Sequence, residues 1–143
     1  MQIKFNDLDP RIIVDSIEIK DGVYYAVCHL KKTKIICPYC NKQTKSIHSS
    51  FTHTFYDIPI QNRPVLIALK KNKYICRNKE CSCKTFSDKT DFISRKGRKT
   101  KRLIKNIVNL NKDLSSIQTS KDIESMGIIA KKSAICNYIK KYQ

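Results

Sequence analysis

Two short stretches, CPYCN at residues 37–41 and CRNKECSC at residues 76–83, hold five of the seven cysteines in this chain of 143 residues. Cys37 and Cys40 are separated by two residues, a spacing that lets both thiolates of one tight turn, or knuckle, reach the same metal ion. Asn41 suits the exit of such a turn because Asn tolerates a positive φ. A structural zinc site takes four sulfur or nitrogen ligands, so the second stretch should supply two more.

The second stretch offers three cysteines for two ligand positions. Cys76 lies at the end of a strand-like run, as Cys37 does, and we expect it to bind the metal. Cys81 lies within the usual ligand spacing of Cys76, whereas the single residue between Cys81 and Cys83 would strain the backbone if both bound one ion. We therefore predict one structural Zn2+, and its predicted ligands are Cys37, Cys40, Cys76 and Cys81.

The remaining thiols and imidazoles have other expected roles. The alternatives to Cys81 as the fourth ligand are Cys83, His48 and His53. Cys28 and Cys136 lie in an apolar strand-like run and on an apolar helix face, which indicates core residues. A catalytic zinc needs an open coordination position beside a general base, and no arrangement of His and Glu in the sequence offers one.

The charge of the chain indicates a polyanionic partner. Lys and Arg number 29 against 12 Asp and Glu, which gives a formal net charge of +17. Residues 1–21 hold three basic and five acidic side chains, so the rest of the chain carries +19. Such a charge attracts nucleic acid first and an anionic membrane surface second.

The N-terminal residues do not form a signal peptide, because acidic side chains stand where an unbroken apolar core is needed. No apolar run approaches the roughly 20 residues that span a bilayer. We therefore expect a cytoplasmic protein, in which reduced, clustered cysteines bind metal more often than they form disulfides.

Four strand-like runs precede residue 90. IIVDSIEI and VYYAVCHL within residues 12–30 flank KDG at 20–22, a hairpin signal. SFTHTFYDIPI at 50–60 and PVLIALKKNKYI at 64–75 are separated by QNR. We expect residues 1–93 to form a small β-rich, zinc-ribbon-like module.

The pattern changes near residue 94. A basic linker is expected at 94–98, and apolar residues at helical spacing then predict a helix over 99–112. DLSS at 113–116 offers N-caps for a second helix to about residue 126, and Gly127 suits the turn before a third helix over 131–141. The expected fold class is α+β, with residues 99–143 as a three-helix helix-turn-helix domain.

In a helix-turn-helix the second helix of the motif enters the major groove. The predicted base-reading residues are Lys131, Lys132, Ser133 and Asn137. The preceding basic arm should contact phosphates through Arg95, Lys96, Arg98, Lys99, Lys101 and Arg102. The alternative is a plain three-helix bundle with a solvated lysine face.

The two knuckles and the segment between them resemble the N-terminal zinc module of the ISL-three family of bacterial insertion-sequence transposases. That module reads as a CPxCG knuckle, a DLP…P segment, a basic strand, and a C-x4-C knuckle followed by TF. The matching residues here are Cys37, Cys40, Asp57, Ile58, Pro59, Pro64, Cys76, Cys81, Thr85 and Phe86, and Asn41 replaces the usual Gly. In the family a helix-turn-helix follows, and then a long catalytic domain whose acidic residues bind two metal ions.

The resemblance implies binding of transposon terminal inverted repeats and places the second knuckle on Cys76 and Cys81. The chain ends at Gln143, so we expect a DNA-binding part of a transposase without catalytic activity. Double-stranded DNA is the expected partner, with a second copy or a full-length transposase as further partners and no small-molecule substrate. The alternatives are a stand-alone transcriptional regulator and a zinc-ribbon module that binds other proteins.

Overall fold

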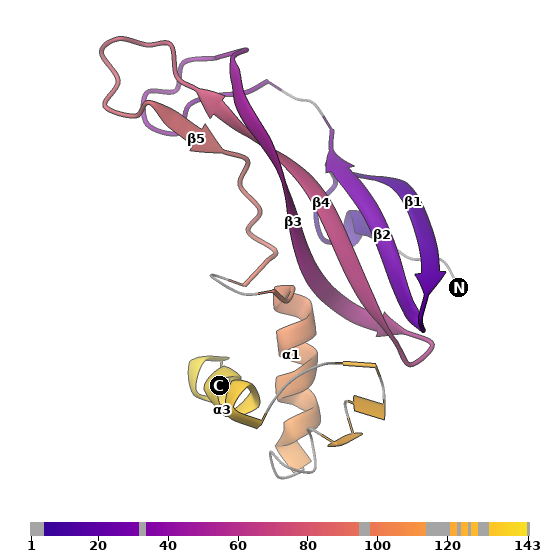
Figure 1. The fold of residues 1–143 in the computed structure, drawn as a ribbon. Coiled ribbons are helices and arrows are strands. Elements are labelled where there is room, and N and C mark those ends of the chain that lie inside the picture. The colour runs from indigo at the N-terminus through magenta and orange to yellow at the C-terminus, as the bar shows by residue number, and fades with distance from the viewer. Residues whose placement is uncertain are drawn as a thin grey trace.

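The computed structural model describes residues 5–31, 34–94, 98–113, 121–122, 124–125, 127–128 and 132–142. A long, twisted mixed sheet of five strands dominates it, and two short α-helices lie beside one end of the sheet (Figure 1). No helix in these ranges is long and apolar enough to cross a membrane. The elements in chain order are η1 (Phe5–Asp7), β1 (Ile12–Lys20), β2 (Val23–Leu30), β3 (Ile47–Ile60), β4 (Arg63–Ile75), β5 (Thr85–Ser87), α1 (Lys101–Leu110), η2 (Asn111–Asp113) and α3 (Lys132–Tyr142).

The predicted hairpin at residues 20–22 is confirmed, and the two later strand-like runs form a second hairpin. β1 pairs with β2 and β3 pairs with β4, in each case antiparallel. The first turn has φ of 53° at Asp21 and 78° at Gly22, and the second has φ of 51° at Gln61 and 59° at Asn62. Two successive positive φ values are typical of the type I′ turn, whose twist matches that of the strands it joins.

The two hairpins join through a parallel contact between β2 and β4, so the strand order is β1-β2-β4-β3. This contact sets Ala26 beside Ile67 and Cys28 beside Leu69, and all four side chains are buried. Cys28 is therefore a core residue as predicted, and burial raises the pKa of its thiol to about 11. Phe5 and Ile93 belong to the same buried cluster, so η1 and the segment after β5 complete the core.

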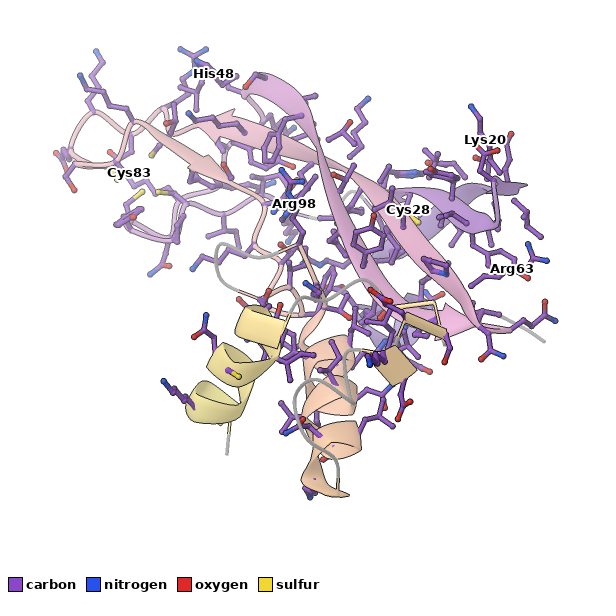
Figure 2. All side chains as sticks on the ribbon, turned by 60° about the horizontal axis from the view of Figure 1, so that its bottom comes forward. Lys20, Cys28, His48, Arg63, Cys83 and Arg98 are labelled. Carbon is purple, nitrogen blue, oxygen red and sulfur yellow. The ribbon has the colours of Figure 1, made fainter. Side chains whose placement is uncertain are left out.

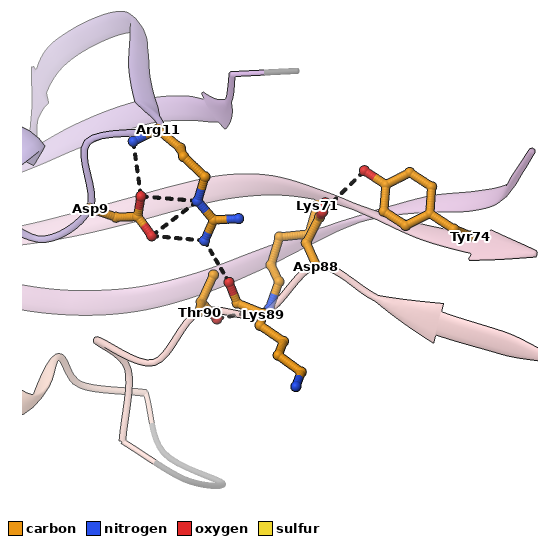
Figure 3. A network of polar contacts seen from close by, with 7 residues as sticks. All are labelled: Asp9, Arg11, Lys71, Tyr74, Asp88, Lys89 and Thr90. Atoms are coloured by element: carbon orange, nitrogen blue, oxygen red, sulfur yellow. Dashed lines mark hydrogen bonds and ion pairs between the residues drawn. The ribbon is translucent and has the colours of Figure 1, made fainter. Parts of the chain in front are cut away.

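Polar contacts hold the segment after β5 against the sheet (Figure 3). The Arg11 guanidinium donates a hydrogen bond of 2.7 Å to the carbonyl of Lys89. The Lys71 ammonium, on the core side of β4, donates one of 2.9 Å to the Thr90 hydroxyl. Burial lowers the pKa of Lys71, and this side chain is nearly inaccessible to solvent. These contacts lead the chain toward the buried Ile93 and from there to α1.

The prediction of a three-helix helix-turn-helix domain is wrong, and the predicted fold class is wrong with it. The helices expected at 99–112 and 131–141 are present as the short helices α1 and α3, and the described residues 121–122 and 124–125 are also helical. The described part of the chain is nevertheless dominated by the sheet and does not form a separate three-helix domain. Most of the second expected helix lies outside the described residues, and its range begins with the 3-10 helix η2. The predicted boundaries at 1–93, 94–98 and 99–143 stay a prediction, and residues 95–97 are not described.

The apolar face of α1 explains the error, because part of it packs on the sheet. Leu103 and Ile107 form a cluster with Ile128 and Ile135, and Tyr56 and Ile58 of β3 pack against the same cluster. Gly127 lies so close to the β3–β4 turn that an added Cβ would be 2.7 Å from the Asn62 carbonyl oxygen. Helical spacing of apolar residues predicts a buried helix face, but it does not specify what covers that face.

One buried carboxylate anchors α1 to the sheet. Asp57 of β3 accepts hydrogen bonds of 2.8 Å from the Thr100 hydroxyl and the Arg102 Nε, and a second contact from the Arg102 guanidinium reaches its other oxygen. Thr100 is also the N-cap of α1, where its hydroxyl accepts the Leu103 amide at 3.3 Å. The side chain of Asp57 is only 2% exposed, so its charge depends on these partners.

We expect the substitution Asp57→Asn to lower the free energy of unfolding by about 1–3 kcal/mol, because the Arg102 guanidinium loses its counter-charge. Urea unfolding of the zinc-loaded protein would measure this loss. Hydrogen exchange should speed up selectively at the amides of 101–110. The matched control is Asp9→Asn in the more exposed Asp9–Arg11 ion pair, which should cost about 1 kcal/mol or less. Equal losses in the two variants would contradict the anchoring role of Asp57.

Candidate metal centre

Four cysteine thiols meet at the end of the sheet distant from the β3–β4 turn. Their sulfur atoms all lie within 4.8 Å of one another. Cys37 Sγ is 3.8 Å from Cys81 Sγ, and Cys40 Sγ is 3.7 Å from Cys76 Sγ. Four sulfurs that each lie about 2.3 Å from a tetrahedral Zn2+ are about 3.8 Å apart. The thiols therefore already have the spacing that zinc requires.

The first knuckle, residues 37–41, is a tight hairpin. The Asn41 amide donates to the Cys37 carbonyl at 2.9 Å, and the Cys37 amide donates to the Lys42 carbonyl at 3.0 Å. Asn41 has the predicted positive φ, at 59°. This closure turns Cys37 and Cys40 toward the same point.

The second knuckle, residues 76–81, continues the pairing of β4 with β5. The Cys76 amide donates to the Lys84 carbonyl at 3.0 Å, one step beyond the pair Ile75 and Thr85. The Cys81 amide donates to the Asn78 carbonyl at 3.1 Å, which closes the turn. The pairing of β4 with β5 thus fixes the position of Cys76 and Cys81 at the end of the sheet.

Thr44 and Ser46 join the two knuckles. The buried Thr44 hydroxyl donates 2.7 Å to the carbonyl of Ile75, and the amide of Ile75 donates 2.8 Å to the carbonyl of Ser46. Ile75 directly precedes Cys76, so these bonds fix the position of the second knuckle relative to the first. Hydrogen bonds within the protein therefore hold together two turns that are far apart in the sequence.

Hydrogen bonds and crowding set the acidity of the four thiols. The Asn78 side chain, followed by the backbone amide of Lys42, lowers the pKa of Cys40 to about 6. The Cys83 amide lowers the pKa of Cys81, but burial and the neighbouring thiols outweigh it and raise that pKa to about 12. Four adjacent thiols cannot all ionise without a compensating cation, which Zn2+ would supply.

Residues 33–83 match the family model described as the zinc-finger of transposase IS204/IS1001/IS1096/IS1165. This segment is a zinc ribbon of the ISL3 transposase type. No curated protein and no solved structure matches the chain. The match spans both knuckles together with β3 and β4, so the resemblance seen in the sequence is confirmed for the zinc module.

The ligand set of this ISL3-type ribbon is the predicted one: four cysteines hold one structural zinc ion. Cys83 is not in the four-thiol group, and its thiol donates 3.0 Å to the carbonyl of Thr85. His48 lies beside the Ser49 hydroxyl at 3.1 Å, and His53 packs edge-on against Phe55. Neither histidine belongs to the thiol cluster. With all four tetrahedral positions taken by sulfur, the site is structural and not catalytic.

The described residues that were predicted to contact DNA differ in how far they are engaged within the protein. Arg102 is engaged by Asp57, and the Lys99 ammonium donates 3.0 Å to the Tyr138 hydroxyl and lies over its ring. Arg98, Lys101 and Asn137 are exposed. Arg95, Lys96 and Lys131 lie outside the described residues, as do the side chains of Lys132 and Ser133 at the start of α3.

A set of exposed cations lies in and beside the two cysteine loops and was not among the predicted site residues. Its exposed members, called the ribbon basic surface below, are Lys34, Lys42, Lys45, Lys70, Arg77, Lys79, Lys84 and Lys89. A cleft of about 500 Å3 separates residues 42–44 from residues 76–80 within this surface. Tyr39, at the tip of the first knuckle, is 70% exposed. The signal was present in the sequence, because most of these cations lie within a few residues of a ligand cysteine.

We expect Cys81→Ser to lose zinc and the matched variant Cys83→Ser to keep it, since only Cys81 belongs to the thiol cluster. Metal analysis after dialysis against a chelator should find about one zinc per chain in the wild type and in Cys83→Ser, and almost none in Cys81→Ser. The opposite pattern would assign the fourth ligand to Cys83.

Zinc binding should weaken as the pH falls. The pKa values of Cys76 and Cys81 are raised in the metal-free site, so both thiols are protonated at neutral pH and must release protons to the solvent when they bind. Two released protons make the apparent affinity fall about 100-fold for each unit of pH decrease. Competition with a chelator of known affinity at several pH values would measure this slope. A slope below one proton would contradict the assignment.

Proposed function

We propose that this chain is the DNA-binding part of an ISL3-type transposase and that it binds the terminal inverted repeats of its element. The observation that carries this proposal is the ribbon basic surface, a set of exposed cations in and beside a zinc ribbon of transposase type, three of which line one cleft. Exposed cations gathered on one structural unit are what a phosphate backbone requires for binding. The transposase match makes DNA the polyanion of choice over a membrane surface.

Few acidic side chains offset this surface. In residues 34–47 and 70–90 the acidic residues are Glu80 and Asp88. Asp88 accepts hydrogen bonds from the Tyr74 hydroxyl at 3.0 Å and from the Asn72 amide at 2.8 Å, so it is committed within the protein. Zinc held by four thiolates carries a net charge of about −2, which the surrounding cations also outweigh.

Arg77 and Lys79 are the central contacts in this proposal. Both are exposed on the second knuckle, and both line the cleft that Lys42 borders from the first knuckle. The Arg77 Nε donates 3.0 Å to the Ser46 hydroxyl, which orients its guanidinium on the surface. Cations would hold phosphates, and the amides of Gln43 and Asn78 in the same cleft could read base edges.

The basic arm extends the proposed contact. Arg98 and Lys101 are exposed, and we propose that they bind phosphates together with Arg95 and Lys96. In this proposal the chain contributes binding and no catalytic step, because its metal site is closed by four thiolates.

We expect the double variant Arg77→Ala/Lys79→Ala to bind a duplex at least about tenfold more weakly and to lower the salt slope of binding by about two. The control, Lys20→Ala/Arg63→Ala, removes the same charge at the end of the sheet opposite to the ribbon, where Figure 2 labels both residues far from Cys83. Fluorescence anisotropy of a labelled duplex at several salt concentrations would measure both. Equal losses of affinity in the two double variants would mean that DNA binds no particular surface of the chain.

Specificity needs a separate experiment. Selection from a randomised duplex library should enrich one sequence, and that sequence should recur as an inverted repeat flanking the gene for this chain. The Arg77→Ala/Lys79→Ala variant should enrich it less strongly. Salt-dependent binding without any enriched sequence would support a non-specific DNA-binding protein and overturn the terminal-repeat proposal.

A further inference from the structure

We propose that the exposed edge of β1 is a dimerisation surface, at which β1 of a second copy adds in antiparallel orientation about a two-fold axis at Ile17. The proposal concerns a different part of the molecule from the zinc ribbon and does not depend on DNA binding.

β1 is the open edge of the sheet. It is the first strand in the order β1-β2-β4-β3, and within the described ranges nothing pairs with its outer side. The opposite edge is partly closed, because Lys99 forms a parallel bridge with Tyr56 of β3. An unpaired strand nine residues long presents a row of free backbone donors and acceptors to a second strand.

Several side chains of β1 are apolar although they are exposed to water. Val14, Ile17 and Ile19 lie opposite Cys28, Ala26 and Tyr24, and so on the face that carries the core. Yet they are 37%, 43% and 57% exposed, because the core layer covers only Ile12 at the start of the strand. The apolar row of the core face therefore continues uncovered to the edge of the sheet.

The reverse face of the same hairpin is also apolar. Ile13, Tyr25 and Val27 are 39%, 38% and 46% exposed, although they share that face with the more polar His29 and Glu18. Both faces at this edge thus have apolar surface to bury. A strand added there would extend the sheet and cover part of each face at once.

A second copy fits this edge better than a nucleic acid does. Two copies that each carry +17 repel one another, and residues 1–21 are the part of the chain where acidic side chains outnumber basic ones. In an antiparallel pair about Ile17, the Val14 end of one strand meets the Ile19 end of the other. Lys20 of each copy then comes beside the bulge at Asp15 of the second copy, whose half-exposed carboxylate also lies 2.8 Å from Nδ1 of its own His29.

The bulge between Val14 and Ser16 limits how far this pairing can spread. Bulges interrupt regular pairing at sheet edges. About an axis at Ile17 the regular pairs are Ile17 with Ile17 and Ser16 with Glu18, and the bulge lies directly beyond them. The pairing joins the same β1 edge of both copies about a two-fold axis, so that edge is used up in each copy. The pairing therefore closes as a dimer and does not grow into a fibre.

Sedimentation equilibrium of the full zinc-loaded chain, across about two decades of micromolar concentration, tests the proposal. The wild type should move from the mass of one chain to the mass of two. Ile17→Lys should weaken association at least about tenfold. The matched control is Ile47→Lys, at an equally exposed position of β3, which should still dimerise. Circular dichroism and zinc content would show that both variants fold.

Hydrogen exchange identifies the surface directly. The backbone amides of residues 16–20 should exchange more slowly at high protein concentration than at low concentration, and Ile17→Lys should abolish this difference. A wild type that stays monomeric throughout overturns the proposal. So does a dimer whose β1 exchange is independent of concentration, or one that Ile47→Lys disrupts as strongly as Ile17→Lys, because the interface then lies elsewhere.

Discussion

The four-thiol cluster is the constraint on which the ribbon end of this molecule depends. Cys37 and Cys40 lie in the loop between β2 and β3, whereas Cys76 and Cys81 follow β4, so one ion joins loops that no core covers. Without the ion, some of the four crowded thiols are ionised and others stay protonated, because the pKa of Cys40 is lowered and that of Cys81 is raised. A small sheet with a thin core gains much of its local order from such a metal.

Asp57 performs the corresponding role at the helical end. It belongs to the FYDIP segment that resembles the transposase motif, and its carboxylate binds both the N-cap of α1 and the Arg102 guanidinium. The motif residue is therefore structural here, because it sets where α1 leaves the sheet. Charge is also distributed unevenly: cations are frequent in the cysteine loops, whereas Asp15 and Glu18 lie on the edge strand β1.

Local signals predicted local structure well. Turn residues at 20–22 placed the first hairpin, because positive φ is costly for most residues and so marks a turn in the sequence. Cysteine spacing selected Cys81 over Cys83, because the reach of a thiolate around one ion is short. The helix-turn-helix prediction was wrong because it depended on contacts between residues that are far apart in the chain. The spacing of Leu103 and Ile107 revealed an apolar face, but Tyr56 and Ile58, more than forty residues earlier, share in covering it.

The sequence by itself determined the strands, their turns, the four zinc ligands and the strong positive charge, since each depends on residues close together in the chain or on composition alone. Only the tertiary structure decided that β2 lies parallel to β4, that Asp57 anchors α1, and that Lys42, Arg77 and Lys79 line one cleft. It also decided that the apolar residues of β1 lie uncovered at an edge. These outcomes depend on which distant segments meet, and burial and pairing between distant segments leave no periodic trace in a single sequence.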